Sequence, residues 1–410
     1  MSATPDGTTP SSTQLHATAD RRPDLRLTYR SVLLGLLLAM IVAVWVPYCM
    51  YIMRGPRMTL SHMSVATLIL FFFMIFCVQI PLQKWKSRWA FSTSELMIMF
   101  SMTLLASTIP GKAFVDYFLG LVGTPNYYAS PENRWVDVFF EFLPDWLIVE
   151  AGAARMFYEG TGSSGVTWGE WIIPMFWWLN LLATMFLVTS CVTVIFRRQW
   201  VEYERLAFPL VRIPMELIDK VGGGKGIPDF MRGRFFWAGF TVTLALLLWN
   251  CVSYFGWVPP IPIGTQYRTT VTLTHSIPPI TVQFNIFAMC FAFFADLTVL
   301  FSIWFFYLLA ILEIGVLNQL GISASGGAGG AAWAVKSQHF GGFWIFVLWG
   351  FWVARHHLRD VFGKALGRRP EVDDSDELFS YRMALIGLAA GLLYIGFWLN
   401  QIGMSVPVIM

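Results

Sequence analysis

Residues 171–196 read WIIPMFWWLNLLATMFLVTSCVTVIF and contain no charged side chain, and the run ends at Arg197 and Arg198. About 20 helical residues cover the roughly 30 Å hydrocarbon core of a bilayer, so this stretch can cross it with some tilt. Arginines at the end of an apolar run are typical of the cytoplasmic side of a membrane. We therefore predict that residues 171–196 form a membrane-spanning helix.

Similar apolar runs recur along the chain. Hydrophobic residues make up 56% of the sequence and charged residues 13%, whereas about a quarter of the residues in a typical soluble domain are charged. The runs are continuous rather than alternating, which favours helices over a β-barrel. The sequence therefore predicts an all-α, polytopic integral membrane bundle of seven or eight transmembrane helices with additional interfacial helices. The other runs are residues 31–53, 58–83, 96–111, 235–266, 281–295, 297–312, 337–354 and 383–410.

The distribution of basic residues predicts the orientation. If the N-terminus is cytoplasmic, 21 of the 28 Lys and Arg residues fall on the cytoplasmic side, as the positive-inside rule requires. The same count needs an even number of crossings between residues 280 and 341. Two solutions stay open: a hairpin of two short spans that meet near Asp296, or one long span followed by a re-entrant passage through residues 321–335.

Five segments follow from this topology. Residues 1–29 are predicted to be a disordered cytoplasmic tail, because they are rich in Thr, Ser, Pro and Asp and lack an apolar period. Residues 30–410 form the transmembrane domain. Within it, we expect residues 112–170 to form an outer-face segment, residues 197–234 a cytoplasmic amphipathic segment, and residues 355–382 a cytoplasmic loop.

The outer-face segment carries eight acidic and three basic residues, with tyrosine and tryptophan scattered among prolines. Aromatic residues beside prolines favour short helices that lie against the membrane surface. Two interpretations remain open for this segment: a structured cap, or the entrance vestibule of a transport pathway.

Several chemistries find no support in the sequence. It contains no HExxH, GxSxG or Walker-type motif and no Cys/His cluster with metal-ligand spacing, so we expect no enzyme activity, no metal site and no cofactor. The five cysteines lie in the apolar runs and are predicted to be buried free thiols. The acidic run at residues 371–377 is predicted to be the solvated start of the last span. A net charge of +3 gives no indication of nucleic-acid binding.

Charges inside a membrane are costly, so each intramembrane polar residue is a candidate for substrate binding or ion coupling. Asp296 separates two apolar runs: in one long helix burial would raise its pKa and suit it to proton coupling, whereas at a hairpin tip it would be a turn residue. Glu95 completes a capping box with Ser92, which favours a structural role. Glu313 lies about 25 Å from Asp296 along a straight helix and needs its own partner. Asn250 can form hydrogen bonds across a helix interface.

Residues 200–220 are predicted to form an amphipathic helix that Pro209 and Pro214 interrupt. An interfacial helix with paired charges and a gating element both fit this pattern. The gate candidates are Glu202, Glu204, Arg205 and Pro209.

Five short motifs carry a resemblance to a known family. They are Ser94-Glu95-Leu96, Ser130-Pro131-Glu132-Asn133, Leu143-Pro144-Asp145-Trp146, Phe157-Tyr158-Glu159-Gly160, and Arg198-Gln199-Trp200-Val201-Glu202-Tyr203-Glu204-Arg205-Leu206-Ala207-Phe208-Pro209. Together they resemble an uncharacterised family of bacterial multi-pass membrane proteins, which is itself related to the oligopeptide transporter superfamily. The similarity extends from about residue 30 to the C-terminus.

The resemblance implies a helical, transporter-like protein of the bacterial inner membrane that moves small peptides or similar small solutes, with proton coupling as in characterised superfamily members. Relatives continue with Ser-Gly-Thr after the Phe-Pro pair and this chain does not, so their substrate contacts cannot be transferred. Family members are longer, and the ending at residues 406–410 within an apolar run leaves a C-terminal truncation open. The alternative function is a non-transporting scaffold or assembly subunit, as a homo-oligomer or with other membrane subunits.

Overall fold

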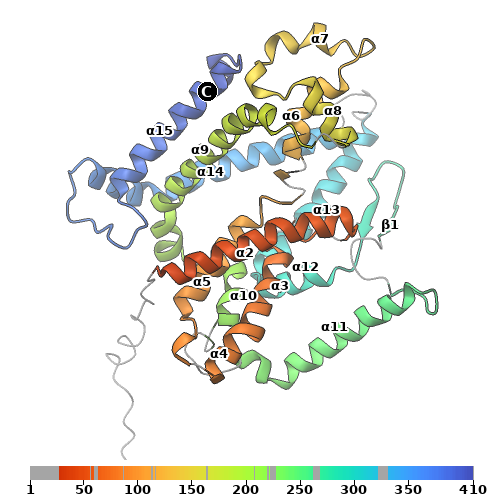
Figure 1. The fold of residues 1–410 in the computed structure, drawn as a ribbon, viewed down its shortest axis with the longest axis vertical. Coiled ribbons are helices and arrows are strands. Elements are labelled where there is room, and N and C mark those ends of the chain that lie inside the picture. Colours follow the sequence, from red (N-terminus) through yellow and green to blue (C-terminus); the bar gives the residue numbers. More distant parts are fainter. Residues whose placement is uncertain are drawn as a thin grey trace, which may run out of the picture. The chain divides into compact units, whose positions relative to one another are not determined.

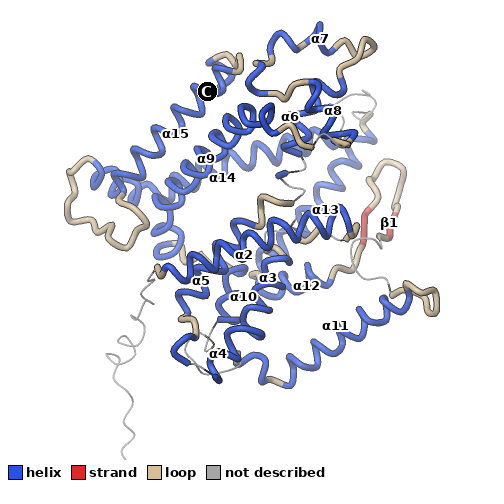
Figure 2. The backbone as a smooth tube through the Cα atoms, in the orientation of Figure 1, coloured by secondary structure: helices blue, strands red, loops and turns tan. Residues whose placement is uncertain are grey.

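The computed structural model describes residues 27–55, 57–59, 63–85, 87–111, 114–115, 117–162, 165–206, 208–218, 221, 228–261, 268–321 and 331–409. Helices account for most of these residues, as Figures 1 and 2 show, and the prediction of an all-α fold is confirmed. The chain divides into two compact units: Met1–Tyr117 with Pro209–Ile261, and Phe118–Phe208 with Pro262–Met410. Most of the predicted tail and of residues 321–335 lies outside the described residues.

Unit 1 contains two long apolar helical segments that are locally wound as π-helix. Helix α2 (Tyr29–Pro47) continues into the π-helical η1 (Tyr48–Ile52), and α3 (Val65–Phe73), η2 (Met74–Gln79) and α4 (Ile80–Trp85) follow one another without a break. The remaining elements of this unit are η3 (Ser87–Trp89), α5 (Thr93–Ala106), α10 (Pro209–Ile218), η8 (Asp229–Arg232) and α11 (Arg234–Ser253).

Helix α2 packs mainly against α5. Gly35 permits the close approach, because a Cβ atom there would lie 2.6 Å from the sulfur of Met102. A buried apolar cluster continues toward α3 and includes Val42, Val46 and Ala66. Small residues at helix crossings and van der Waals packing are the usual means by which membrane helices associate.

Unit 2 begins with short helices and ends with long ones. The short elements are α6 (Tyr117–Tyr128), α7 (Trp135–Val138), η5 (Phe140–Phe142), η6 (Asp145–Leu147) and α8 (Ala151–Glu159). The later elements are α9 (Trp168–Arg198), η7 (Gln199–Tyr203), β1 (Thr269–Val271), β2 (Ile280–Val282), α12 (Ile286–Phe294), α13 (Leu297–Gln319), α14 (Ala331–Ala365), α15 (Tyr381–Gln401) and α16 (Val406–Ile409).

Helices α9 and α15 run along each other, as Figure 1 shows, and α14 contacts both. Their crossing is close because a Cβ atom on Gly391 would lie 2.5 Å from a methyl carbon of Val188. Near the C-terminal end of α9, Ile195, Val361 and Tyr381 form a fully packed apolar cluster. The three helices therefore share one core.

Several helices start at the residue where a side chain can replace a missing helical hydrogen bond. Thr28, Ser64, Ser92, Asp296 and Ser380 each accept a bond from a backbone N–H of the first turn. Such N-caps stabilise a helix start by about 1 kcal/mol. At Ser92 the reciprocal bond from Glu95 is also present, so the predicted capping box is confirmed.

Six helical segments of the described part are long and apolar enough to cross a membrane, and α5 is a shorter apolar helix. They are Tyr29–Ile52, Val65–Trp85, Trp168–Tyr203, Arg234–Ser253, Leu297–Gln319 and Tyr381–Gln401. This composition and length make the chain an integral membrane protein whose surroundings are a lipid bilayer.

The structure corrects three local predictions. Residues 281–295 do not form a span: the chain passes from β2 into α12, whose nine residues cover only about 14 Å. Strands β1 and β2 form a small antiparallel pair that the helical prediction missed. Residues 200–220 are interrupted before Pro209, as predicted, because helical structure ends at Tyr203 and α10 starts at Pro209, but Pro214 lies inside α10 and does not end it. Proline suits a first helical turn, where its missing N–H is not needed.

Candidate functional site

Helix α8 separates two pockets of different character. Its sequence AGAARMFYE places Ala153, Met156 and Phe157 along one pocket, and Arg155 and Glu159 along the other. This spacing is that of an amphipathic helix, in which residues three and four positions apart share a face. Residues 112–170 contain short helices, as predicted, and these helices line the two pockets, one of them together with the first turns of α9.

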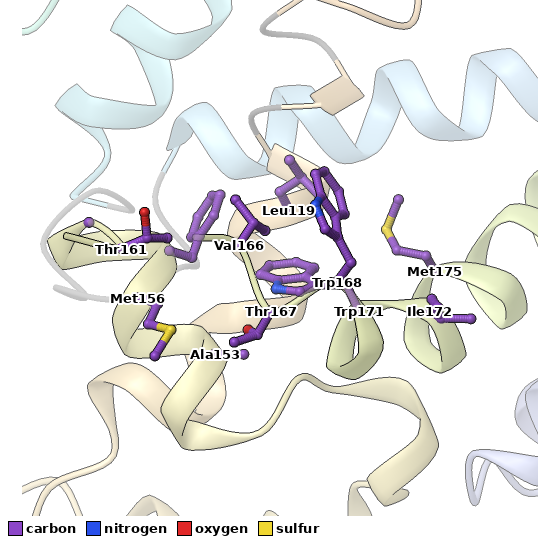
Figure 3. Close-up of a pocket in the computed structure, with 12 residues that line it drawn as sticks. Leu119, Ala153, Met156, Thr161, Val166, Thr167, Trp168, Trp171, Ile172 and Met175 are labelled. Carbon is purple, nitrogen blue, oxygen red and sulfur yellow. The ribbon is translucent and has the colours of Figure 1, made fainter. Parts of the chain in front are cut away.

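The apolar pocket, which we call the α8 pocket, lies between α8, α6 and the first turns of α9 (Figure 3). Its volume is about 630 Å³, within the roughly 300–1,000 Å³ of ordinary ligand sites. None of the lining side chains that the structure describes is charged. The lining includes Met156, Phe157, Trp168, Trp171, Ile172 and Met175.

The α8 pocket has a rigid support. The Phe157 ring packs against the buried ring of Trp171, with centroids 5.4 Å apart. Tyr158 ties α8 to α6, because its hydroxyl donates to the carbonyl of Gly120 (3.2 Å) and lies 3.0 Å from the hydroxyl of Thr124. The pocket is therefore formed before any ligand enters, which lowers the entropic cost of binding.

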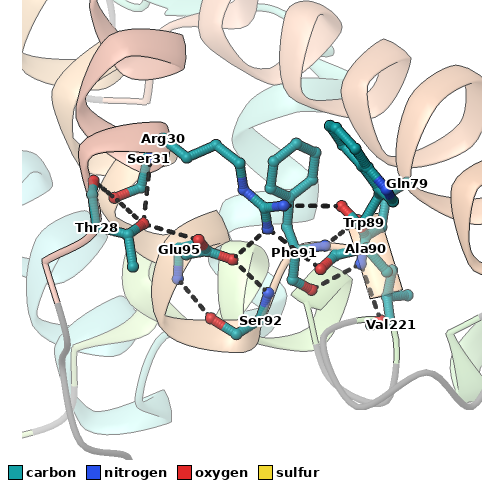
Figure 4. A network of polar contacts seen from close by, with 10 residues as sticks. All are labelled: Thr28, Arg30, Ser31, Gln79, Trp89, Ala90, Phe91, Ser92, Glu95 and Val221. Atoms are coloured by element: carbon teal, nitrogen blue, oxygen red, sulfur yellow. Dashed lines mark hydrogen bonds and ion pairs between the residues drawn. The ribbon is translucent and has the colours of Figure 1, made fainter. Parts of the chain in front are cut away.

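Apart from the pockets, a network of polar contacts surrounds Glu95 (Figure 4). The Glu95 carboxylate accepts hydrogen bonds from Arg30 Nη2 (2.9 Å), from the Thr28 hydroxyl (2.7 Å) and from the Ser92 backbone N–H (2.9 Å). Glu95 is only 6% exposed. A buried charge needs such partners, because leaving them out would cost several kcal/mol.

Arg30 is held on its other side by backbone and aromatic groups. It donates to the carbonyls of Trp89 (3.1 Å) and Ala90 (3.2 Å), and its guanidinium lies 4.5 Å above the Phe91 ring. These contacts join the start of α2 to the loop before α5. The network is structural in character, since its donors and acceptors satisfy one another.

Gln79 connects the loop before α5 to Val221, which follows α10. Its side chain is fully buried and binds both backbone groups of Phe91, at 2.9 and 2.8 Å, and it also donates to the carbonyl of Val221 (3.3 Å). Gln83 donates to the same carbonyl. The two glutamines, in η2 and α4, therefore connect the helical segment Val65–Trp85 to Phe91 and to Val221.

A third feature lies where α9, α14 and α15 meet. Arg197 makes two hydrogen bonds to Glu377, at 2.6 and 2.7 Å, and the Tyr381 hydroxyl donates to the same carboxylate (3.3 Å). Beside it, a ring nitrogen of His357 lies 2.8 Å from the carbonyl of Ile195. The Glu377 side chain is 2% exposed, so the prediction of a solvated acidic run is wrong at this residue.

The model of DUF6785, a family of unknown function, matches residues 21–410. The chain belongs to the DUF6785 family. No curated protein and no solved structure was found to match it. The predicted membership of an uncharacterised family is therefore confirmed, and the relationship to oligopeptide transporters has no support from these comparisons.

In this DUF6785 chain Asp296 lies at a helix start. Its carboxylate accepts a hydrogen bond from the Thr298 N–H (2.7 Å), and the residue is exposed. Hydrogen bonds from the Thr298 hydroxyl and N–H hold the pKa of Asp296 below its ordinary value. One long helix through this position is therefore wrong, and the raised pKa expected for it is absent.

The other two substrate candidates each have a local partner. Glu313 is half-buried and accepts a hydrogen bond from the amide of Gln338 on α14. The Asn250 side chain binds both backbone groups of Ile261, at 2.8 and 3.1 Å. Asn250 therefore clamps the loop after its own helix rather than a neighbouring helix. Among the described interactions, none joins two of the four candidates to each other.

The gate candidates lie around the π-helical η7. Arg198 donates to Glu202 (3.0 Å), and the Gln199 amide donates to Glu204 (2.9 Å). These pairs agree with the interpretation of an amphipathic element with paired charges. Whether this element moves as a gate stays a prediction.

The π-helical segments η1 and η7 end in the same way. In each, an arginine adopts a left-handed backbone, Arg54 with φ 52° and Arg205 with φ 50°. The next residue then closes a wide backbone bond, Gly55 to the carbonyl of Cys49 (2.7 Å) and Leu206 to that of Trp200 (2.9 Å). Pro209 follows the second of these turns as the first residue of α10. Two apolar helices therefore end in one structural motif, which the sequence did not reveal.

All five cysteines are free, but only Cys191 is buried, while Cys77, Cys251 and Cys290 are exposed. The prediction of buried thiols is therefore wrong for those three. Within the described ranges, no group of three or more His, Cys, Asp or Glu side chains lies close enough to hold a metal ion.

Proposed function

We propose that this protein is a membrane carrier whose α8 pocket holds the apolar part of a small amphiphilic solute. The observation that carries the proposal is the size and lining of that pocket, which is large enough for a small molecule and is lined mainly by aliphatic and aromatic side chains. A dipeptide has charged ends that this lining would leave without partners, which is costly. An amphiphile with its polar end at the pocket mouth therefore fits better than a peptide.

The backbone offers secondary support for transport. Three apolar helical segments contain π-helical turns, η1, η2 and η7, and such turns are frequent at functional sites. The break at Asp296 between α12 and α13 also resembles the discontinuous helices of many secondary transporters.

Proton coupling is a further part of the proposal, and Glu313 is the acid best suited to it. The carboxylates of Glu95 and Glu377 are each held in an ion pair with an arginine. Glu313 is half-buried, and its described partner, the Gln338 amide, is neutral. Replacing Glu313 by Gln should abolish the response of uptake to a pH gradient while leaving downhill flux in place.

The orientation remains part of the proposal as well. We expect the chain in the bacterial inner membrane with a cytoplasmic N-terminus, on the evidence of its Lys and Arg distribution. Fusions of alkaline phosphatase after Tyr128 and after Leu366 test this. Activity after Tyr128 and inactivity after Leu366 are expected, and the reverse pattern would contradict the orientation.

The test of transport uses the purified chain in proteoliposomes and the uptake of radiolabelled decyl sulfate, a permanently charged amphiphile that crosses bilayers slowly. Val166→Trp places a large side chain at the α8 pocket and should abolish uptake. Val136→Trp is the matched control, because Val136 is similarly exposed and is not among the lining residues. Uptake that is absent from the native chain, or equal in both variants, would overturn the proposal. Uptake of the dipeptide Leu-Phe in preference to decyl sulfate would restore the peptide hypothesis.

The alternative is a scaffold or assembly subunit. It is favoured by the closed networks of Glu95 and Glu377, neither of which lines a described pocket. Extraction in native lipid particles followed by mass spectrometry tests it. A stoichiometric second membrane subunit, or a defined homo-oligomer without uptake activity, would favour this alternative over the carrier.

A further inference from the structure

The polar face of α8 forms a second pocket together with the C-terminal end of α6, which we call the tyrosine pocket. Its volume is about 540 Å³. The lining contains hydroxyl, amide and charged groups in addition to aromatic rings, in contrast to the α8 pocket. Tyr127, Tyr128, Arg155 and Glu159 are among the lining residues.

Two tyrosine rings of this pocket belong to a packed group of three. The rings of Tyr127 and Tyr128 are 4.8 Å apart and nearly perpendicular, at 89°, in an edge-to-face contact. Tyr158 stacks on Tyr127 with centroids 4.2 Å apart and lies edge to face with Tyr128 at 5.5 Å, so the positions of the rings are well supported. Tyr128 keeps 52% of its surface exposed. An exposed aromatic ring face attracts an ammonium group, because the face is electronegative.

The charges of the tyrosine pocket are available to a ligand. Arg155 and Glu159 are 3.8 Å apart, and their side chains are 75% and 55% exposed. An exposed ion pair of this length contributes little stability, so a ligand can replace it at small cost. The guanidinium of Arg155 can then bind an anionic group, and the Glu159 carboxylate can face a cation near the tyrosine rings.

We propose that the tyrosine pocket binds a small zwitterion, with its ammonium group at Tyr127 and Tyr128 and its anionic group on Arg155. Two sources supply this chemistry: the headgroup of a zwitterionic phospholipid, or a free solute such as a phosphorylated amino alcohol. This site is separate from the α8 pocket and does not rest on the carrier function.

Calorimetric titration of the full chain in dodecyl maltoside tests the proposal with phosphocholine as the probe. Choline and methyl phosphate, which each carry one of the two charges, should bind more weakly than phosphocholine. Tyr128→Leu should weaken phosphocholine and choline binding about fivefold, since it removes one aromatic wall. Arg155→Gln should weaken phosphocholine and methyl phosphate binding about tenfold and leave choline unaffected.

Arg134→Gln is the matched control, because Arg134 belongs to the same segment, is 72% exposed in its side chain and is not among the lining residues. It should bind phosphocholine as the native chain does. Tyr128→Phe keeps the aromatic wall and should also bind normally, which separates loss of the ring from misfolding. Absence of phosphocholine binding to the native chain, or binding that neither Tyr128→Leu nor Arg155→Gln weakens, would overturn the proposal.

Lipid nanodiscs then distinguish the two sources. If the natural ligand is a phospholipid headgroup, discs of phosphatidylcholine should already occupy the site and block added phosphocholine, whereas discs of phosphatidylglycerol should not. Equal titration in both kinds of disc assigns the pocket to a free solute.

Discussion

Arg197 and Glu377 form a bidentate ion pair, with Nε to Oε2 at 2.6 Å and Nη2 to Oε1 at 2.7 Å, across 180 positions of sequence. The pair joins the C-terminal end of α9 to the segment that precedes α15. Its carboxylate is almost fully buried, whereas the Arg197 side chain is 34% exposed. The position of α15 along α9 is therefore fixed by a charge contact in addition to apolar packing.

Glu377→Gln should lower the stability of the protein, because it removes the bidentate counter-charge of Arg197 and leaves only the more distant Glu202 carboxylate, at 3.9 Å. Breaking a buried pair costs about 3–5 kcal/mol, and the partial exposure of Arg197 reduces this to about 2 kcal/mol. Thermal unfolding in detergent, followed by tryptophan fluorescence, measures the change. Asp137→Asn, which removes an exposed pair with Arg134, serves as the control and should change little. Equal effects of the two substitutions would contradict this account.

Gly391→Leu should separate α9 from α15, since even a Cβ atom there would lie 2.5 Å from Val188. Overpacking of this kind costs about 1–3 kcal/mol. Gly350→Leu on α14 is the matched control, because a Cβ atom at Gly350 meets nothing within 4 Å. The melting temperature should fall for the first variant only. A similar fall for both would indicate that helix crossing is not the cause.

Asp296→Ala should weaken the start of α13, whereas Asp296→Asn should behave almost like the native chain, because Asn is also a good N-cap. The pKa of Asp296 is lowered in the folded protein, so its stabilising effect is present above the ordinary pKa of 3.8 and is lost as the pH falls through the lowered value. Melting temperatures from pH 3 to pH 7 test both points. A larger effect of Asn than of Ala would exclude a capping role.

Glu95→Gln should reduce stability without changing the pH dependence of uptake, because Glu95 is bound by Arg30, Thr28 and Ser92. Arg30→Met should reduce stability in the same way, since it leaves the carboxylate without its counter-charge. Melting curves and uptake at two pH values separate the possibilities. A stable Glu95→Gln variant that has lost its pH response would make Glu95 a coupling residue instead.

The sequence predicted the parts of the fold that depend on local pattern. Six of the nine predicted apolar runs correspond to helical segments long and apolar enough to cross a membrane, and the capping box at Ser92 and Glu95 formed as its spacing indicated. The run at residues 281–295 failed because an apolar composition does not fix helix length, and a strand precedes α12.

Contacts between distant segments were beyond local pattern. The neighbours of Glu377 in the sequence are acidic and polar, which suggested a solvated loop, yet its partner lies in another helix. The α8 pocket needs side chains from α6, α8 and α9 in one place, and no spacing rule predicts that. The alternation of apolar and charged residues in α8 was the signal that could have indicated a helix between two different environments.

The most direct test of the carrier account is the rate at which a maleimide labels Met156→Cys in a chain whose five native cysteines have been replaced. Decyl sulfate should slow this labelling, and methyl sulfate, which lacks the apolar chain, should not. Val136→Cys, an exposed position that lines neither pocket, is the control and should react equally with or without decyl sulfate. Labelling of Met156→Cys at an unchanged rate in saturating decyl sulfate would contradict the claim that the α8 pocket holds the apolar part of a solute.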